Sequence, residues 1–260
     1  MEPELLAGAS TLRAEPLSED CRLIWKRGDH ALIGISGGNS YFNQDRLTAL
    51  LCWAGEHFTE IDVVYVDMHM DDMLVADGHT PERAARSVRS TLKDVRRRIR
   101  RSLERLGPEA KRFRVRALSE VTPLPAYQSV RNRIEQALVT DRDFYAACDR
   151  MVRQVANHRT QSHAATGMPT TEAHLTAGLH YVTAEAPLFI DSPAIFDVPS
   201  STLLYHLRTP VTDYLAGRQT GFRAAPGQGY VVVAPPTSTR AEHLGDPAEP
   251  DLLNRTAPMS

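Results

Sequence analysis

The sequence predicts an α/β fold in which helices flank a mainly parallel β-sheet. Two observations favour this class. Short β-rich apolar segments alternate along the chain with longer helical patterns, and 260 residues that are 42% hydrophobic are enough to bury one sizeable core. Alternation of strands and helices implies right-handed crossovers, and in such sheets ligands bind beyond the carboxyl ends of the strands.

The elements follow in order. The apolar run 31–35 ends in a glycine turn and predicts a buried strand, and 43–57 predicts a helix. A second buried strand is expected at 61–67. The alternating segment 113–118 predicts a third. Between them we expect a long helix over 80–106, with Thr80 as N-cap and Pro81 at the first helical position. The rest comprises helices near 126–139, 142–159 and 172–185, a mixed region around 203–207, and a late strand at 230–233.

One domain is expected over residues 21–235. Residues 1–20 and 236–260 are rich in Pro, Ala, Glu and Ser and are expected to be flexible tails. The three cysteines share no close spacing, which argues against a disulfide framework or a zinc site and favours a reducing cytoplasm. We expect neither a signal peptide nor a membrane span, because no apolar run reaches the ~18–20 residues that a span needs.

Ser36 follows the first strand, at an end where ligands are expected. Gly34-Ile35-Ser36-Gly37-Gly38 satisfies the G-x-S-x-G pattern of hydrolase elbows, but lies too early in the sheet for that fold. The stretch 36–40 also resembles the pyrophosphate loop of ATP pyrophosphatases, one residue short and without its aspartate. As a third interpretation, Ser36 attacks an activated acyl group. The loop alone does not choose between a nucleophile and a serine that caps the next helix.

The long helix carries an excess of positive charge, although the whole chain has a net charge of only −2. Its apolar positions fall on one side of the helix and its cations on the other. Arginine outnumbers lysine, as suits bidentate contact with phosphate, and the pattern favours binding of a shaped RNA backbone over reading of bases. A solvated charged face is the alternative. The candidate cations are Arg86, Arg89, Lys93, Arg96, Arg97, Arg98, Arg100 and Arg101.

Two further pairs are candidates for the second half of the site. Tyr181 and Glu185 lie four residues apart on one helix face in apolar surroundings, where a carboxyl group would have a raised pKa suited to proton transfer. Tyr205 and His206 end an apolar run and are uninformative by themselves. Acidic and histidine residues at 67–72 (Asp67, His69, Asp71, Asp72) fit no common ligand spacing, so no metal site is expected.

Taken together, these residues resemble the cyclodipeptide synthases, and in particular the Streptomyces-type enzymes of the albonoursin pathway. The resemblance covers roughly residues 20–235. The motifs that carry it are the Gly34-x-Ser36 loop with Asn39-Ser40-Tyr41-Phe42, the strand Val64–Asp67, the arginine-rich helix, Tyr181-x-x-x-Glu185-Ala186-Pro187, and Pro199-Ser200-Ser201 before Tyr205-His206. Asn39, Tyr205 and His206 match the signature of one branch of that family.

The resemblance implies a monomeric Rossmann-type domain similar to the catalytic core of class I tyrosyl- and tryptophanyl-tRNA synthetases. It implies that two aminoacyl-tRNAs are the substrates and that no cofactor or ATP is used. Ser36 would carry the aminoacyl and then the dipeptidyl group, Tyr181 and Glu185 would bind the amine, and Tyr205 would assist proton transfer. Gly34 and Asn39 would shape the loop, and His206 would support Tyr205.

The family also implies two side-chain pockets. The first would be lined, besides Gly34, by Leu32, Val64, Leu118, Leu188 and Leu203. Its apolar lining predicts a bulky hydrophobic first residue such as Phe or Leu. The second is expected near Met151, Gln154, Val155, His158 and Leu207. Two other functions remain open at this stage: an ATP pyrophosphatase-type RNA-modifying enzyme and a non-catalytic RNA-binding protein.

Overall fold

A computed structural model of the chain describes residues 12–37, 39–162, 171–217 and 220–235. The strands are β1 (Arg13–Pro16), β2 (His30–Ile35), β3 (Glu60–Tyr65), β4 (Phe113–Ala117), β5 (Ser201–Tyr205) and β6 (Gln228–Ala234). The helices are α1 (Glu19–Arg27), α2 (Gln44–His57), α3 (Met70–Ala76), α4 (Pro81–Leu106), α5 (Leu118–Val121), α6 (Pro125–Thr140), α7 (Arg142–Ser162), α8 (Glu172–Ile190), α9 (Ser192–Phe196) and α10 (Pro210–Gly217). Two 3-10 helices, Ser40–Phe42 and Gly107–Arg112, complete the described elements.

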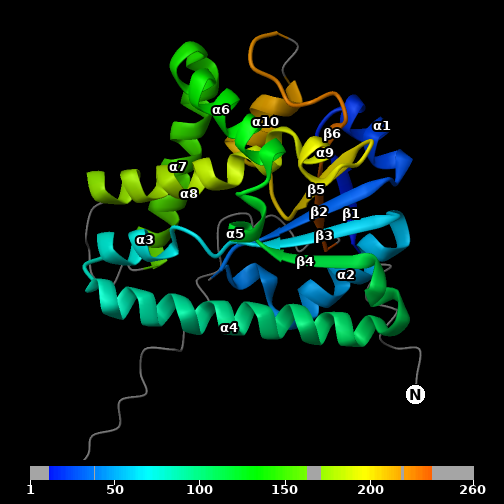
Figure 1. Ribbon diagram of the computed structural model, residues 1–260, viewed down its shortest axis with the longest axis horizontal. Helices are drawn as coiled ribbons and strands as arrows, with labels where there is room; N and C mark the ends of the chain where they lie inside the picture. Colours follow the sequence, from blue (N-terminus) through cyan, green and yellow to red (C-terminus); the bar gives the residue numbers. More distant parts are fainter. Residues whose placement is uncertain (1–11, 38, 163–170, 218–219, 236–260) are drawn as a thin grey trace, which may run out of the picture.

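The strands form one six-stranded sheet in the order β1-β6-β5-β2-β3-β4 (Figure 1). All neighbouring strands are parallel except β1, which pairs with β6 in the antiparallel direction. From β2 the chain moves first to one side of the sheet, through β3 and β4, and later to the other, through β5 and β6. The predicted α/β class with a mainly parallel sheet is confirmed, and the border between β2 and β5 is the switch point at which such folds bind ligands.

Helices cover both faces of the sheet, and each face has its own hydrophobic cluster (Figure 1). On one face α2 and α4 pack through residues such as Leu51, Val95 and Ile99 against Ile33 and Val63. On the other, residues from α6 to α10 meet Leu32, Val64 and Leu203 in the cluster that contains the candidate pocket. Alternate residues of β2 and β3 thus belong to opposite clusters, as strand geometry requires.

Helix α4 begins and ends as the sequence predicts. Thr80 Oγ1 accepts a hydrogen bond from the amide of Arg83, and Pro81 occupies the first turn. Gly107 terminates the helix with a backbone φ of 60°, which glycine adopts at little cost. The buried side of α4 is formed by Ala84, Leu92, Val95, Ile99 and Ser102.

A polar chain of side chains crosses four neighbouring strands inside the sheet. His30 joins Ser201 through Nδ1 at 2.7 Å and Asp62 through Nε2 at 3.1 Å. Arg114 donates to the same carboxylate at 2.7 Å, and Arg116 lies 3.2 Å from its other oxygen. Burial would raise the pKa of Asp62, but the hydrogen bonds from His30 and Arg114 outweigh it, and the pKa is lowered. This network links the neighbouring strands β5, β2, β3 and β4 through their side chains.

Three expectations need correction. The tail expected at 1–20 is structured from residue 13 onward, because β1 adds an edge strand to β6 and Glu19 begins α1; a half-buried edge strand carries no apolar run to reveal it. The helix expected to end near residue 185 continues through Pro187 to Ile190. The mixed region near 203–207 contains a regular strand, β5. Within the described residues, every helix is too short or too polar to cross a lipid bilayer.

Candidate active site

Ser36 lies directly after β2, and Tyr205 is the last residue of β5, the parallel neighbour of β2. The sheet therefore places the serine and the tyrosine at the same edge, at the switch point. Asp67, at the end of β3, has a structural task instead: its carboxylate accepts hydrogen bonds from the Ser119 amide at 2.9 Å and hydroxyl at 2.6 Å. The resemblance assigns both residues to the reaction, and that assignment stays a prediction.

Helix α8 brings Tyr181 and Glu185 to the serine. Tyr181 Oη donates to Glu185 Oε1 at 3.4 Å, one helical turn away. The Ser36 side chain hydrogen-bonds to both Tyr181 and Tyr205, and each of these bonds acts to lower the pKa of the tyrosine. Four groups that are far apart in the sequence thus form one cluster, which we call the serine site: Ser36, Tyr181, Glu185 and Tyr205.

Burial makes the serine site electrically neutral at neutral pH. It raises the pKa of Glu185 to about 8, although the hydrogen bond from Tyr181 acts in the opposite direction. Burial likewise raises the pKa of Tyr181 and Tyr205 well above their ordinary value, with the nearby Glu185 adding to the effect. The carboxyl group therefore titrates close to neutrality, which suits a residue that takes up and returns a proton.

The serine loop is held by its own residues and by α3. The side-chain oxygen of Asn39 accepts a hydrogen bond from the backbone N–H of Tyr41 at 2.9 Å. The backbone N–H of Asn39 donates to the Ser36 carbonyl at 3.4 Å. A Cβ atom at Gly37 would collide with Met70 Cε, so Met70 packs directly on the loop. By contrast, a Cβ at Gly34 would meet nothing within 4 Å. Gly34 therefore leaves open space beside Ser36 and serves no close packing contact.

His206 belongs to an aromatic stack next to the serine site. Its ring lies 4.0 Å from the ring of Tyr41 and nearly parallel to it, with Phe42 at its edge and Tyr205 at 4.5 Å. Burial lowers the pKa of His206 to about 4, and Arg46 contributes. The imidazole is therefore uncharged at neutral pH, and its ring packs against that of Tyr205.

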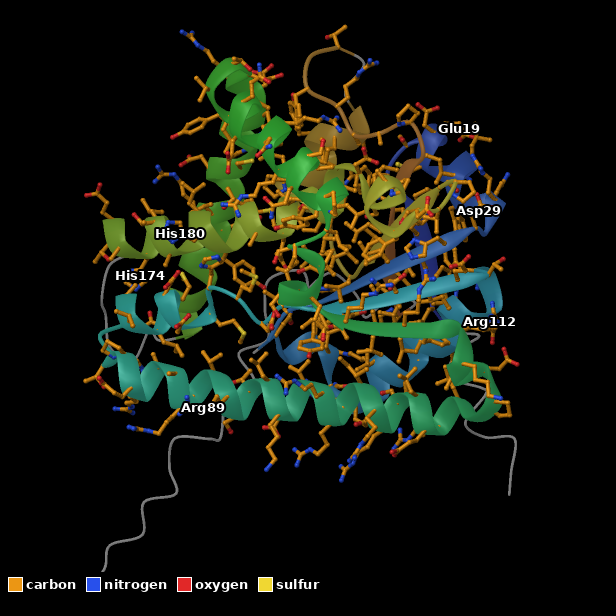
Figure 2. The ribbon with its side chains drawn as sticks, viewed as in Figure 1. Glu19, Asp29, Arg89, Arg112, His174 and His180 are labelled. Carbon is orange, nitrogen blue, oxygen red and sulfur yellow. The ribbon has the colours of Figure 1, made fainter. Side chains whose placement is uncertain are left out.

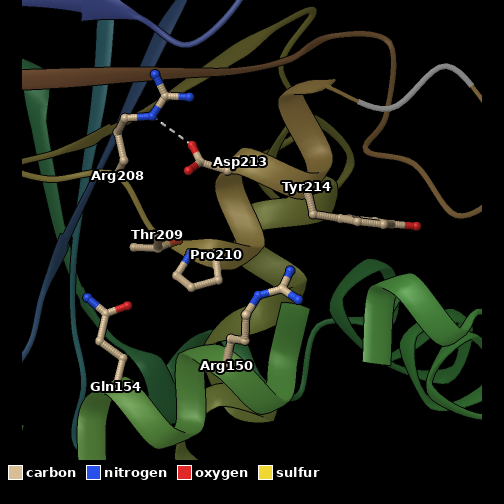
Figure 3. Close-up of a pocket in the computed structure, with 7 residues that line it drawn as sticks. All are labelled: Arg150, Gln154, Arg208, Thr209, Pro210, Asp213 and Tyr214. Atoms are coloured by element: carbon tan, nitrogen blue, oxygen red, sulfur yellow. Dashed lines mark hydrogen bonds and ion pairs between the residues drawn. The ribbon is translucent and has the colours of Figure 1, made fainter. Parts of the chain in front are cut away.

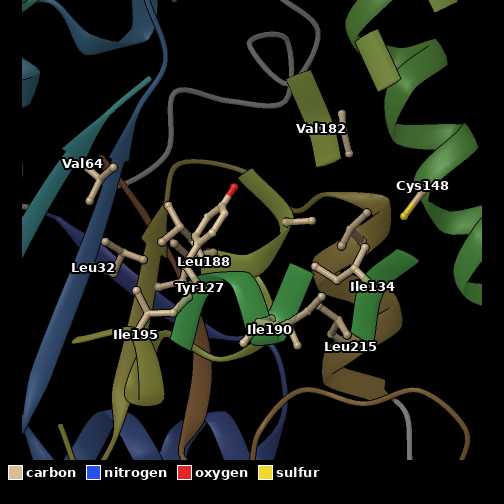
Figure 4. Close-up of a cluster of buried hydrophobic side chains, with 14 of the residues drawn as sticks. Leu32, Val64, Tyr127, Ile134, Cys148, Val182, Leu188, Ile190, Ile195 and Leu215 are labelled. Atoms are coloured by element: carbon tan, nitrogen blue, oxygen red, sulfur yellow. The ribbon is translucent and has the colours of Figure 1, made fainter. Parts of the chain in front are cut away.

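The residues expected to line the first pocket are neighbours in space. In the sheet, Leu32 pairs with Leu203 and Gly34 with Val64. Leu118 begins α5 and Leu188 lies on α8, and all five apolar residues belong to one buried cluster. Figure 4 shows Leu32 and Val64 on adjacent strands, with Leu188 and Tyr127 on the helical side. The open space at Gly34 adjoins this cluster, at the serine.

The expected second pocket is only partly described. Met151 is buried in the core, and Leu207 is half-buried in the segment after β5. Gln154 lines a hollow of about 540 Å³ between α7 and α10, with Arg150, Thr209 and Pro210 (Figure 3). At its rim Arg208 pairs with Asp213 at 2.8 Å. The side chains of Val155 and His158 lie outside the described residues.

The cations of α4 form an exposed surface on the side away from the sheet, where Figure 2 shows Arg89. Arg86, Arg89, Lys93 and Arg101 are exposed and make no ion pair with the described part of the chain. Arg97 pairs with Asp94 at 2.8 Å, Arg100 lies 3.6 Å from Glu104, and Arg96 stands over the Tyr65 ring.

Arg98 differs from the other candidate cations. It is half-buried, and its guanidinium donates to the Phe42 carbonyl at the end of the 3-10 helix that follows the serine loop. Arg98 therefore contacts the serine loop region and does not belong to the exposed cationic surface of α4. A helical wheel could have raised this possibility, because Arg98 follows the buried Val95 by three residues and precedes Ile99.

Two residues that pack against the elements of the serine site were not predicted from the sequence. Tyr127 of α6 donates a hydrogen bond from Oη to the backbone carbonyl of Ala184 at 2.7 Å, directly before Glu185. Pro187 has no N–H to donate, so the neighbouring carbonyl of Thr183 lacks its helical hydrogen bond. Met70 packs on the serine loop. The contact from Tyr127 spans 57 residues and left no local signal; neither residue forms part of a recognisable pattern.

Most of the chain matches a known protein family. Residues 12–235 match the profile of the family described as cyclodipeptide synthase. The cyclo(L-leucyl-L-phenylalanyl) synthase of Streptomyces noursei is 55% identical over 86% of this chain and 92% of that protein. The cyclo(L-tyrosyl-L-tyrosyl) synthase of Mycobacterium tuberculosis is 35% identical over 90% of this chain and 79% of its own length.

Solved structures agree with these relatives. A crystal structure of cyclo(L-leucyl-L-phenylalanyl) synthase has a TM-score of 0.82, is 55% identical, and is matched over 86% of this chain and 99% of that one. A Mycobacterium tuberculosis protein has a TM-score of 0.78 and is 34% identical over 87% of this chain and 94% of that one. Its structure is described as demonstrating that cyclodipeptide synthetases are related to type I tRNA synthetases. A synthase of Candidatus Glomeribacter gigasporarum bound to Phe-tRNAPhe shares the fold, with a TM-score of 0.51 at 13% identity over 88% and 93%.

Proposed function

Because the chain belongs to the cyclodipeptide synthase family, whose members are tRNA-dependent aminoacyltransferases, we propose that it joins the amino acids of two aminoacyl-tRNAs into a hydrophobic 2,5-diketopiperazine. One observation carries the proposal: the Ser36 hydroxyl meets Tyr181 and Tyr205 beside the buried carboxyl group of Glu185. The reaction follows a ping-pong course through an aminoacyl-serine and then a dipeptidyl-serine. Neither an ATP-dependent modification nor simple RNA binding requires this arrangement.

In the first transfer, Ser36 Oγ attacks the ester carbonyl of the first aminoacyl-tRNA. The bond between Oγ and the carbonyl carbon forms, the bond to the terminal ribose oxygen breaks, and that oxygen ends with the serine proton. Tyr205 keeps its own proton at neutral pH because burial raises its pKa, so it can relay a proton to the leaving oxygen. The ester is already activated, and the protein mainly supplies position.

In the second transfer, the amino group bound to Tyr181 and Glu185 attacks the ester carbonyl of the second aminoacyl-tRNA. The amine must first lose a proton. The pKa of Glu185, about 8, is close to the ordinary α-amino value of about 7.7–8.0. The fraction of Glu185 that is ionised near neutrality therefore accepts this proton at little cost in free energy. An amide bond forms, the bond from the carbonyl carbon to the terminal ribose oxygen of the second tRNA breaks, and that oxygen takes up the proton that the nitrogen loses. Ser36 now carries a dipeptide.

Ring closure releases the product. The free amine of the dipeptide attacks the ester carbonyl on Ser36, the second amide bond forms, and the serine oxygen leaves and recovers a proton through Tyr205. The neighbouring His206 does not supply that proton, because its lowered pKa of about 4 leaves it neutral. Its contribution is to hold Tyr205 in the aromatic stack.

The exposed α4 surface is the proposed site for tRNA phosphates. Arg86, Arg89, Lys93 and Arg101 are the cations best placed for this, since they are exposed and unpaired within the described chain. The relative from Candidatus Glomeribacter gigasporarum was solved with Phe-tRNAPhe, which agrees with a tRNA substrate.

For the amino acids, the apolar first pocket favours Leu or Phe. Its lining of Leu32, Val64, Leu118, Leu188 and Leu203 offers no charged partner to a substrate side chain. The relative with 55% identity is a cyclo(L-leucyl-L-phenylalanyl) synthase, which supports a product that contains Leu. One methylene changes discrimination by only ~1–3 kcal/mol, so closely related side chains should also be accepted.

The substitution Ser36→Ala tests the proposal. Incubation with one aminoacyl-tRNA should add one aminoacyl group to the mass of the unmodified protein, and the variant should neither gain this mass nor release a cyclic dipeptide. Ser129→Ala, at an exposed position of α6, is the matched control and should behave as the parent. Product formation by Ser36→Ala at the parental rate would contradict the proposal.

A further inference from the structure

A second cluster of chemical groups lies outside the serine site, between α3 and α8. It consists of His69, at the residue before α3, Asp72 in its first turn, and His180 on α8. One nitrogen or oxygen from each lies within 4.8 Å of the others. Asp72 Oδ2 is 3.1 Å from His69 Nδ1 and 3.4 Å from His180 Nδ1. Figure 2 shows His180 on α8, on the side of the molecule where α3 lies.

We propose that His69, Asp72 and His180 bind a divalent cation of the zinc class. In tetrahedral zinc sites the bonds to His nitrogen and carboxylate oxygen are about 2.0–2.2 Å, which separates neighbouring ligand atoms by about 3.3–3.6 Å. The two measured distances to Asp72 Oδ2 are close to this edge length. Two imidazoles and one carboxylate suit zinc and its neighbours among the transition metals, and the exposed position of the cluster leaves room for water as a fourth ligand.

The backbone at His69 supports the same assignment. Its φ of 57° and ψ of 14° lie in the left-handed region, which it shares only with Asp197 among the described non-glycine residues. Such a conformation costs about 1–2 kcal/mol and is uncommon outside functional or turn positions. It occurs at the N-cap of α3, yet the His69 side chain makes no capping hydrogen bond. The side chain instead faces Asp72 and His180.

Without a metal, the cluster is one carboxylate oxygen that accepts hydrogen bonds from two imidazoles. The other two carboxylates of the segment 67–72 lie outside this cluster. Asp67 is engaged by Ser119, and Asp71 is exposed and outside the cluster. The missing ligand for a metal in this segment comes from His180, 108 residues beyond Asp72, which explains why the spacing at 67–72 matched no ligand pattern.

A bound ion would join two parts that hold the serine site. His69 directly precedes Met70, which packs on Gly37 in the serine loop. His180 directly precedes Tyr181. The site would therefore tie the turn behind the loop to the helix that carries Tyr181 and Glu185. The proposal concerns metal binding alone, and it can be tested whether or not the chain transfers acyl groups.

The experiment uses the full chain without an affinity tag, stripped of metal with a chelator and titrated with zinc chloride in a calorimeter. We expect one zinc ion per chain at the cluster. Asp72→Asn and His180→Asn should each weaken this binding at least about tenfold, since loss of a mere supporting partner already costs that much. Asp71→Asn removes the same charge from the same helical turn and should leave binding unchanged.

Cobalt chloride provides a second readout. Tetrahedral Co²⁺ gives strong visible absorption, which should appear with the parent chain and with Asp71→Asn and disappear with His180→Asn. All three substituted side chains are partly or largely exposed, so the metal-free variants should melt like the metal-free parent. Zinc should raise the melting temperature of the parent and of Asp71→Asn, and leave that of Asp72→Asn and His180→Asn unchanged. The proposal is overturned if zinc does not bind, or if it binds Asp72→Asn and His180→Asn as tightly as the parent.

Discussion

Glu185→Gln should remove a pH-dependent loss of stability. Glu185 is 8% exposed, and burial raises the pKa of its carboxyl group from 4.5 to about 8. At about 1.4 kcal/mol for each unit of pKa, ionising this group in the folded chain costs on the order of 5 kcal/mol. Glutamine has nearly the same shape and carries no charge, so the variant avoids that cost.

The sign follows from the number of bound protons. Between pH 4.5 and about pH 8 the folded chain keeps the Glu185 proton, whereas the unfolded chain has lost it. The contribution of the group is therefore fully present below pH 4.5 and is lost progressively as the pH rises toward 8. Relative to the parent, Glu185→Gln should gain stability over this range, by several kcal/mol at pH 8.5 compared with pH 5.

Urea unfolding at half-unit steps from pH 5 to pH 9 measures this difference. Glu172→Gln, at an exposed position in the first turn of the same helix, is the matched control and should follow the parent curve. If the difference in unfolding free energy between parent and Glu185→Gln stays constant across this range, Glu185 is not a desolvated acid. The proton transfer proposed for it would then lose its physical basis.

Asp62→Ala should lower the free energy of unfolding by about 1–3 kcal/mol at neutral pH, because the buried His30 loses the partner of its Nε2, whereas the partly exposed Arg114 keeps Glu60. Since folding lowers the pKa of Asp62, the effect should fade as the pH falls through the pKa of Asp62 in the folded chain; an equal effect at all pH values in urea titrations would refute it. Arg89→Ala should weaken tRNA binding and reduce the slope of log affinity against log salt by about one; an unchanged slope would count against phosphate contact. Arg98→Ala should instead lower the melting temperature, with little change in the slope of log affinity against log salt. An unchanged melting temperature together with a reduced slope would indicate that Arg98 contacts tRNA phosphates.

The main strands and the long helix could be predicted because their signals are local. β2 and β3 are continuous apolar runs that are buried on both faces, and α4 has its own cap, an apolar stripe and a terminating glycine. β1 and the end of α8 could not be predicted in this way. The first is held by backbone pairing with β6, and the second passes through Pro187 because packing against α6 and α9 compensates for the lost helical hydrogen bond.

Much of the serine site was accessible through family resemblance, and only a part through physics. The spacing of Tyr181 and Glu185 predicts a shared face and a desolvated carboxyl group, and the structure has both. No spacing connects either residue to Ser36 or to Tyr205, since that contact depends on strand order and on helix packing. For the same reason the sequence concealed the third member of the His69, Asp72 and His180 cluster.

The pairing of β2 with β5 also determines when the serine site can exist. The contact between these strands closes a loop of 171 residues from His30 to Ser201, so it belongs to the slow, non-local part of folding. Ser36 is synthesised early, but Tyr181, Glu185 and Tyr205 leave the ribosome much later. Under the proposed acyl transfer, a growing chain surrounded by aminoacyl-tRNA during translation therefore carries Ser36 without the groups proposed to assist it. In that mechanism, the order of synthesis delays acyl transfer until β5 has joined the sheet.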